Sequence, residues 1–363
     1  MEEAFAEQIV PGTFIRVLSE GLIAPKGVSF GNVGIVGTAA AAAGAPADVI
    51  GSTQILSSLE DGQKLYKFKR TGGADTDPLN LARSLKLLFD NGARTVYSHA
   101  LAAGASLDDF SAAFAELRKD DINIVLAPEL ATADAKTVLG SVLENGENDG
   151  RDMIGIIGSD AAKVADINAQ VATNKRVVLT APAVNGFDPV SGTVTKLDGG
   201  YTAAALAGLV ASLAPQSSPT NKALPGIGSL ATRFGYGELK SLVQGNVCVL
   251  EDRQGIRVVR GITTEGAAFS QITTRRIVDF AKAGIRQVAG PFVGKLNNDR
   301  VRKALRGAID SFLTTMLVDE ALTGYELDVT ATRADEIAGR CNVNVAMQPT
   351  FSIDYIRVTL ALS

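Results

Sequence analysis

The chain has 363 residues, of which 46% are hydrophobic and 20% are charged, with a formal net charge of −4. This composition is typical of a soluble globular protein that can bury a large core, and its length favours about two domains. A slightly acidic chain gives no reason to expect nucleic-acid binding or attraction to a membrane.

Few residues can supply metal or acid–base chemistry. Cys248 and Cys341 are the only cysteines, and His99 is the only histidine. Two isolated cysteines make neither a disulfide framework nor a metal site, and one histidine excludes multi-histidine metal centres. We therefore expect no metal and no cofactor.

No segment resembles a targeting or membrane-spanning sequence. The start, "MEEAFAEQIV", is acidic and lacks the apolar core of a secretory signal. The longest apolar run, Ala203–Ala214, is too short to cross a bilayer. We expect a protein that is made in a cytoplasm and does not insert into membranes.

The first 22 residues are predicted to form an extended arm. Pro11 and Gly12 precede a segment rich in residues that favour β-structure, and no hairpin partner follows nearby. The expected strand contains Thr13, Phe14, Ile15, Arg16 and Val17 and ends near Leu18.

Residues 23–240 alternate between strand and helix patterns. Strands are expected at Val33–Gly37, Thr95–Ala100, Ile122–Pro128, Met153–Gly158 and Arg176–Pro182. Helices are expected in "DPLNLARSLKLLFDNGA" and near 106–118, 131–145, 160–173 and 200–213. Continuous apolar strands between helices predict an α/β domain with a parallel sheet covered on both faces. Residues 214–228 are read as a linker or an ordered surface loop.

Residues 241–350 are predicted to form a separate α+β unit. A hairpin is expected over Asn246–Gly261, followed by long helices near 269–288 and 297–318. Further strands are expected in "YELDVTATRADEI" and "NVNVAM".

The motifs that could mark an enzyme are incomplete. Gly31, Gly34 and Gly37 have the spacing G-x-x-G-x-x-G, which is neither a dinucleotide fingerprint nor a phosphate loop, and we expect them to permit close packing. His99 and Ser159 lie near strand ends, but no G-x-S-x-G nucleophile motif is present. Ser159 with Asp160 is instead expected to cap the next helix.

Positive charge is concentrated in one stretch. Arg260–Asp310 contains ten basic and four acidic residues, a net charge of +6, against −10 for the remainder. On the second long helix the apolar stripe is Leu305, Ile309, Phe312 and Met316. The basic residues there form either a solvated face or a ridge that meets an acidic partner.

The segment Phe351–Ser363, "FSIDYIRVTLALS", has the alternation of a half-buried strand. Such a strand can add to the sheet of another copy, and a contact between unlike surfaces repeats into a ring or an open helix. The residues expected to make this contact are Ile353, Tyr355, Ile356, Val358, Leu360 and Leu362.

Several segments, taken in their order along the chain, resemble the tail sheath proteins of contractile bacteriophages and of pyocin-like and other contractile injection particles. They are "PGTFIRVLSEGLIAPKGVSFGNVGIVGTA", "GITT", "ITTRRIVDFAKAGI", "FVGKLNNDRVRKALRGAIDSFL" and "NVNVAMQPTFSIDYIRVTLAL". The resemblance implies a virion protein that polymerises helically around an inner tail tube and contracts to drive the tube through a cell envelope.

The resemblance also implies roles for particular segments. Residues 1–22 and 351–363 become arms that link neighbouring copies, around an outer domain at 23–240 and an inner domain at 241–350. The outer domain would resemble a subtilisin-like fold without a catalytic triad. The candidate tube-facing residues are Arg300, Arg302, Lys303 and Arg306. The implied partners are other copies, the tube protein, and baseplate and tail terminator proteins.

Two other functions are compatible with parts of the pattern. An α/β enzyme that transfers nucleotide or acyl groups, with a C-terminal dimerisation domain, would share the middle alternation. An inner-tube or capsid-associated protein would also polymerise, but a tube protein is expected to be mainly β, which the long helices oppose.

Overall fold

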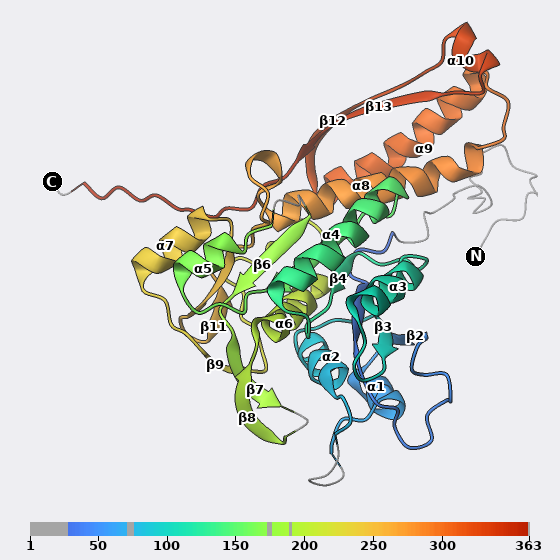
Figure 1. Ribbon diagram of the computed structural model, residues 1–363. Helices are drawn as coiled ribbons and strands as arrows, with labels where there is room; N and C mark the ends of the chain where they lie inside the picture. The colour runs from blue at the N-terminus through green and yellow to red at the C-terminus, as the bar shows by residue number, and fades with distance from the viewer. Residues whose placement is uncertain (1–27, 71–75, 173–175, 189–190, 362–363) are drawn as a thin grey trace, which may run out of the picture.

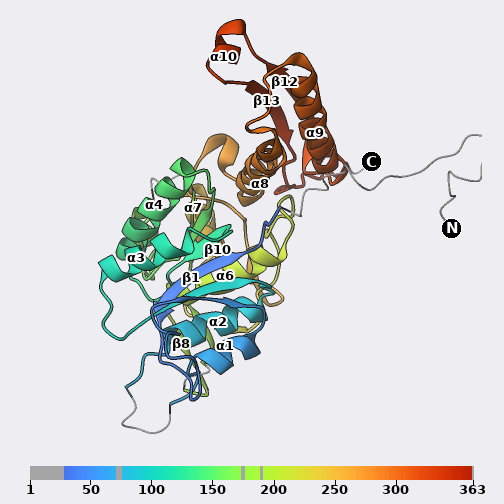
Figure 2. The same ribbon diagram turned by 90° about the vertical axis from the view of Figure 1, so that its right-hand side faces the viewer.

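The computed structural model describes residues 28–70, 76–172, 176–188 and 191–361. A large α/β unit carries a C-terminal unit of two long helices and a two-stranded sheet (Figures 1 and 2). The expected N-terminal strand at residues 13–17 and Leu362 lie outside the described residues.

An eight-stranded sheet forms the centre of the α/β unit, in the order β11-β10-β6-β5-β4-β1-β3-β2. Every pairing from β10 to β3 is parallel, and the edge strands β2 and β11 are antiparallel to their neighbours. The strands are β1 (Val33–Thr38), β2 (Thr53–Leu56), β3 (Val96–Leu101), β4 (Ile124–Leu126), β5 (Ile154–Gly158), β6 (Val177–Ala181), β10 (Cys248–Asp252) and β11 (Ile256–Val258). The predicted parallel sheet is confirmed.

Helices cover both faces of this sheet, because its strands are apolar on both sides. One buried cluster joins the sheet to α2 and α6, and a second joins it to α3, α4, α5 and α7. The helices of this unit are α1 (Leu59–Leu65), α2 (Asn80–Asp90), α3 (Leu107–Leu117), α4 (Thr132–Asn148), α5 (Val164–Ala169), α6 (Gly199–Ser212) and α7 (Tyr236–Gln244). The predicted two-sided covering is therefore present.

Close packing explains two of the three glycines noted in the sequence. A Cβ atom on Gly31 would lie 2.3 Å from the carbonyl oxygen of Ala211, and one on Gly34 would lie 2.9 Å from Ile122. A larger residue at either position would force the chain apart.

A small antiparallel sheet follows β6, in the order β8-β7-β9. Its strands are β7 (Val184–Asp188), β8 (Thr193–Leu197) and β9 (Ile227–Leu230). The stretch at 214–228 is thus ordered and leads into a strand, which settles the choice between linker and ordered segment.

The C-terminal unit contains α8 (Ile272–Ala289), α9 (Asp299–Val318), β12 (Leu322–Thr330), α10 (Arg333–Ile337) and β13 (Asn342–Pro349). Short 3-10 turns at Ala267–Phe269 and Gly290–Phe292 flank α8. The predicted apolar stripe of α9 is confirmed, because its residues are buried against α8 and the two strands.

Three sequence predictions are wrong, one about this region and two about the α/β unit. The hairpin β10–β11 exists, but β10 pairs with β6, so residues 248–258 belong to the large sheet and not to a unit that starts at residue 241. The helix expected at 160–173 spans only Val164–Ala169, and Lys163 at its N-cap position makes no side-chain capping hydrogen bond. Ser159 instead accepts a hydrogen bond from the backbone of Ala161 and donates one to Gln170.

Candidate assembly surfaces

Residues 351–361 form an extended arm that leaves the body of the protein (Figure 1). No part of it pairs as a strand with the rest of the described chain. Its large apolar side chains are between 58% and 86% exposed: Phe351, Ile353, Tyr355, Ile356, Val358 and Leu360. An extended backbone with exposed apolar side chains is a segment that can add to another sheet.

The β12–β13 sheet is a possible acceptor. Its two strands pair over Leu322–Thr330 and Asn342–Pro349, and neither outer edge has a strand partner among the described residues. A two-stranded sheet alone is marginally stable, so added strands would strengthen it.

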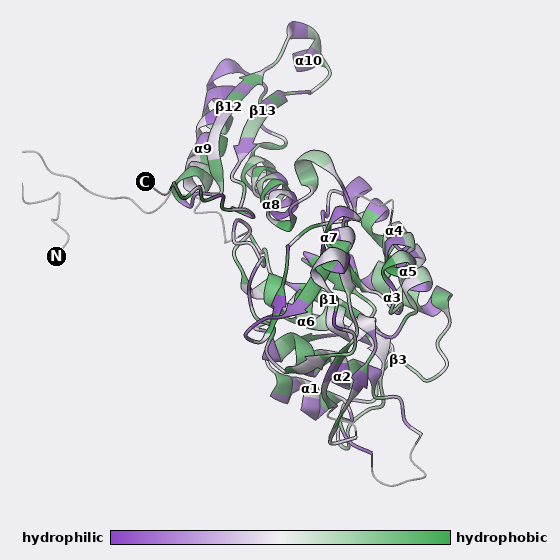
Figure 3. Ribbon diagram, turned by 90° about the vertical axis from the view of Figure 1, so that its left-hand side faces the viewer, coloured by the Kyte–Doolittle hydropathy of each residue, from purple (hydrophilic) through white to green (hydrophobic). Residues whose placement is uncertain are grey.

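The two faces of this sheet differ. Alternate side chains pack against the helices α8 and α9: Tyr325, Leu327, Val329, Val343, Val345 and Met347. The intervening residues, among them Glu326, Asp328 and Asn344, are exposed. The mixture of hydrophobic and hydrophilic residues along both strands is visible in Figure 3. Because one face is already packed, an added strand would have to match its alternation.

The basic residues of α9 fall into two groups. Arg300, Lys303 and Arg306 are exposed, and Lys303 pairs with Asp299 at 2.8 Å. Arg302 is different: its guanidinium donates to Glu336 of α10 at 2.9 Å and to the side chain of Asn297. The expectation that Arg302 belongs to an exposed ridge is therefore wrong, because this side chain holds α10 to the start of α9.

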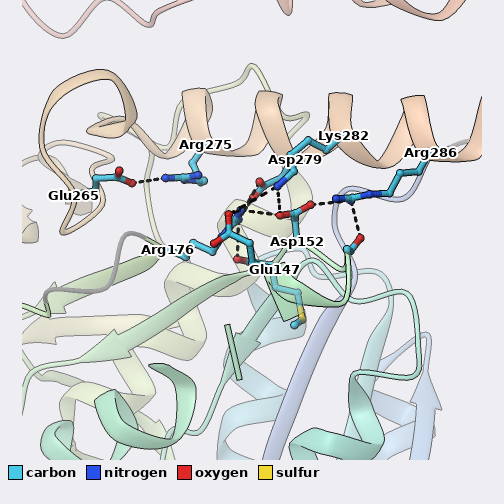
Figure 4. A network of polar contacts seen from close by, with 10 residues as sticks. Glu147, Asp152, Arg176, Glu265, Arg275, Asp279, Lys282 and Arg286 are labelled. Carbon is cyan, nitrogen blue, oxygen red and sulfur yellow. Dashed lines mark hydrogen bonds and ion pairs between the residues drawn. The ribbon is translucent and has the colours of Figure 1, made fainter. Parts of the chain in front are cut away.

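A network of charges joins α8 to the α/β unit (Figure 4). Arg176 and Asp152, whose side chains are each 2% exposed, are 2.7 Å apart. Arg176 also contacts Glu147 at 3.0 Å and Asp279 of α8 at 2.8 Å. Lys282 and Arg286, both from α8, contact Asp152 from the other side.

Burial and ion pairing shift the pKa values of Asp279 and Asp152 in opposite directions. Burial raises the pKa of Asp279 to about 6, although Arg176 acts in the opposite direction. Burial also acts to raise the pKa of Asp152, but hydrogen bonds from Lys282 and Arg286 outweigh it and hold that pKa below its ordinary value. The contact between α8 and the α/β unit therefore consists mainly of ion pairs between charged side chains.

Sequence reasoning did not find this network. The available signal was Arg176 itself, because an arginine immediately before a strand as apolar as "VVLTA" needs buried carboxylate partners. Those partners are far away in sequence, so their identity could not be read from spacing.

His99 has a structural position. It is buried in β3, and its Nδ1 atom lies 3.1 Å from the hydroxyl of Thr53 on the neighbouring strand. Burial lowers the pKa of His99, against the opposing influence of Glu116. The imidazole is therefore neutral near pH 7 and packs as part of the sheet.

At the edge of the sheet where α/β enzymes bind ligands, side chains that line an open pocket are hydrogen-bonded to one another. Glu129, which follows β4, accepts hydrogen bonds from the backbone and the hydroxyl of Thr38 and from Asn80. Asn80 in turn accepts from Tyr201 and Arg83. These contacts tie β1, α2 and α6 together at this edge.

The described residues contain neither a candidate metal site nor a candidate membrane span. Groups of three or more histidine, cysteine, aspartate or glutamate side chains that could hold a metal ion do not occur there. Nor does any described helix have the length and apolarity to cross a membrane.

Two protein-family models match the chain. The model of the phage tail sheath protein central domain matches residues 103–264, and that of the phage tail sheath C-terminal domain matches residues 264–363. No curated protein matches the chain. The change from one model to the other at residue 264 follows β11, where the large sheet ends.

Solved structures with the same fold cover nearly the whole chain. The contracted helical sheath of the anti-feeding prophage has a TM-score of 0.76 and 17% identity, over 97% of this chain and 99% of that chain. The contracted sheath of the extracellular contractile injection system PVC has a TM-score of 0.72 and 15% identity, over 97% of both. The sheath tail protein of Listeria innocua has a TM-score of 0.68 and 13% identity, over 90% and 94%.

Proposed function

Because this chain belongs to the phage tail sheath family, we propose that it is a subunit of a contractile tail sheath. Copies polymerise into a helical sheath, and contraction of that sheath drives an inner tube through a cell envelope. The observation that carries this proposal is the arm at residues 351–361, which is extended, apolar and unpaired within the described chain.

The arms of neighbouring copies extend the β12–β13 sheet. Two open edges can accept two further strands, one from the C-terminal arm of one neighbour and one from residues 13–17 of another. Main-chain hydrogen bonds then supply affinity, and the alternating side chains select the register. Each link joins unlike surfaces, so repetition produces a helix and not a closed dimer.

Removal of the arm tests this proposal. A protein truncated before Ile356 should remain folded and should not polymerise, because it lacks the strand that a neighbour accepts. Arg357→Gln, which leaves the apolar residues of the arm in place, is the matched control and should polymerise like the wild type. Ordinary sheath-like tubes of the truncated protein in electron micrographs would exclude this role for the arm.

The exposed basic residues of α9 face the tube. Arg300, Lys303 and Arg306 project from one helix of the C-terminal unit and would meet an acidic tube surface. Attraction between exposed charges is screened by salt, so this contact should weaken as ionic strength rises.

Charge reversal tests the tube contact. The variant Arg300→Glu with Arg306→Glu should lose co-sedimentation with tube protein while it still polymerises through its arms. Lys163→Glu with Lys240→Glu makes the same change of net charge on the α/β unit and serves as the control. Equal co-sedimentation of both variants with the tube would remove the basic residues of α9 from the interface.

The remaining partners follow from the same role. Baseplate and tail terminator proteins would meet the two ends of the polymer, and the sheath would be assembled in a host cytoplasm as part of a virion or a related particle. The role needs no catalysis, and His99 and Ser159 serve the packing of the sheet.

A further inference from the structure

The C-terminal arm is not free along its whole length, because its root is held by the body. Ser352 and Asp354 contact two residues of the segment that leads into α8, Arg260 and Gln271. We call these four residues the arm anchor. Beyond Tyr355 the arm is exposed.

The side chain of Gln271 makes the two hydrogen bonds to the backbone of Ser352 that a neighbouring strand would make. Its side-chain amide donates to the carbonyl oxygen of Ser352 at 3.2 Å, and its amide oxygen accepts from the backbone N–H of Ser352 at 3.0 Å. Both main-chain groups of Ser352 are therefore hydrogen-bonded to the side chain of one buried residue, which stands at the N-cap position of α8. Ser352 cannot offer these groups to another strand at the same time.

Asp354 is held by two donors. Arg260 donates to its carboxylate at 2.7 Å, and Gln271 donates to the same oxygen at 3.0 Å. The Asp354 side chain is only 6% exposed, although both of its neighbours in sequence are largely exposed. The guanidinium of Arg260 also lies 5.5 Å from the centre of the Tyr355 ring. A charge-assisted, largely buried contact fixes this point of the chain more firmly than an exposed pair would.

A fixed root determines which arm residues reach a neighbour and which way they face. Successive side chains of a strand point to opposite faces, so a shift of one residue exchanges the apolar residues Ile356, Val358 and Leu360 for Arg357 and Thr359. An arm that could slide at its root would sample both registers. An arm held at Asp354 presents only one.

We propose that the arm anchor sets the register of the strand that this protein donates to its neighbour. This inference rests on the proposed function, since it assigns a positioning role in the same strand exchange. The anchor also orders the root before binding, which reduces the entropy that is lost when the arm docks. Arg260, Gln271 and Asp354 are thus positioning residues, and Ile356–Leu360 make the contact itself.

Insertions between Tyr355 and Ile356 test the register directly without changing the body. One inserted serine moves the apolar residues to the wrong face, and we expect it to raise the concentration at which polymer forms by about tenfold or more. Two inserted serines restore the facing and should polymerise closer to the wild type. Equal behaviour of the two insertions would overturn the proposal.

Exchange of the charged pair tests the anchor. Arg260→Asp alone should place two carboxylates together and reduce polymer formation, and Arg260→Asp with Asp354→Arg should recover it by restoring the pair. Asp48→Asn, at an exposed position, is the control for removal of a charge. Melting of the unassembled protein separates misfolding from loss of register. If Arg260→Asp melts and polymerises like the wild type, the anchor has no positioning role.

The two proposals fail in different ways. If the wild-type protein forms no polymer under any condition, the proposed function fails. If the wild type polymerises and the insertions show no dependence on whether one or two residues were added, only the role of the anchor fails.

Discussion

Arg176 contacts carboxylates from three separate parts of the chain. Glu147 belongs to α4, Asp152 precedes β5 and Asp279 belongs to α8. Burial acts to lower the pKa of Arg176, but the carboxylates outweigh it and hold that pKa above its ordinary value. The buried Arg176 guanidinium is stabilised by carboxylates from both units, so this contact holds the two units in one arrangement.

Loss of this arginine should be costly. Arg176→Met leaves the buried carboxylate of Asp279 without its guanidinium partner and removes one of the partners of Asp152, and we expect the free energy of unfolding to fall by about 3–5 kcal/mol. Asp279→Asn is the matched control, because Arg176 keeps Glu147 and Asp152 and the amide is less costly to bury. Urea denaturation of both variants measures the difference. A smaller loss for Arg176→Met than for Asp279→Asn would contradict this account of the network.

At the scale of elements, α8 contacts the first described residues of the chain and begins directly after Gln271 of the arm anchor. Arg276 donates to the carbonyl oxygens of Leu213, Ala214 and Phe30, and burial lowers the pKa of its guanidinium to about 10. The Phe30 ring packs edge-on against Phe280, with centroids 6.3 Å apart. The described chain therefore begins against one part of α8, while the C-terminal arm is anchored at the start of the same helix.

The packing of α8 against α9 depends on one glycine. A Cβ atom on Gly284 would lie 1.9 Å from the ring of Phe312. Gly284→Ala should therefore destabilise the protein by about 1–3 kcal/mol, even though alanine favours a helix. Gly307→Ala, on α9 with open space around the added atom, should stabilise it by about 0.5–1 kcal/mol. Thermal melting compares the two, and an unchanged or raised melting temperature for Gly284→Ala would contradict the packing argument.

The parallel strands were predictable because each is a short, continuous apolar run between helical patterns. Long amphipathic helices such as α9 were predictable for a similar reason, since their buried stripe repeats along the chain. The pairing of β10 with the large sheet could not be predicted. Its partner β6 lies about 70 residues earlier, and nothing in either strand specifies that pairing.

The assembly residues were predictable only in part. Alternation in the last segment predicted a half-buried strand; residues 353–360 are extended and without a strand partner in the described chain, so their pairing with another copy stays a prediction. The anchor was not foreseen, because Arg260 and Gln271 are ordinary polar residues about 80–95 positions before their partners. Charge counting also could not separate Arg302, which is paired with Glu336, from its exposed neighbours. The subtilisin-like comparison and the tube contacts remain predictions.

For the whole molecule, the structure combines a firmly packed body with an arm that is anchored at its root and has no strand partner within the described chain. The ion pairs of Asp279 and Lys282 with the α/β unit, and the packing of Ile272 into its main apolar cluster, join the two units, so a copy can move as one body during contraction. The links between copies would be strands added to the β12–β13 sheet, which can persist while the bodies between them rotate.

A cryo-electron microscopy map of the polymer formed by the purified full-length protein tests the central claim most directly. The account predicts a hollow helical tube in which the β12–β13 sheet of each copy carries added strands from its neighbours. One of these should contain Ile356–Leu360 of a different copy, with its apolar residues toward α8 and α9. A map in which this arm returns to its own body, or in which copies touch only through their α/β units, would contradict it.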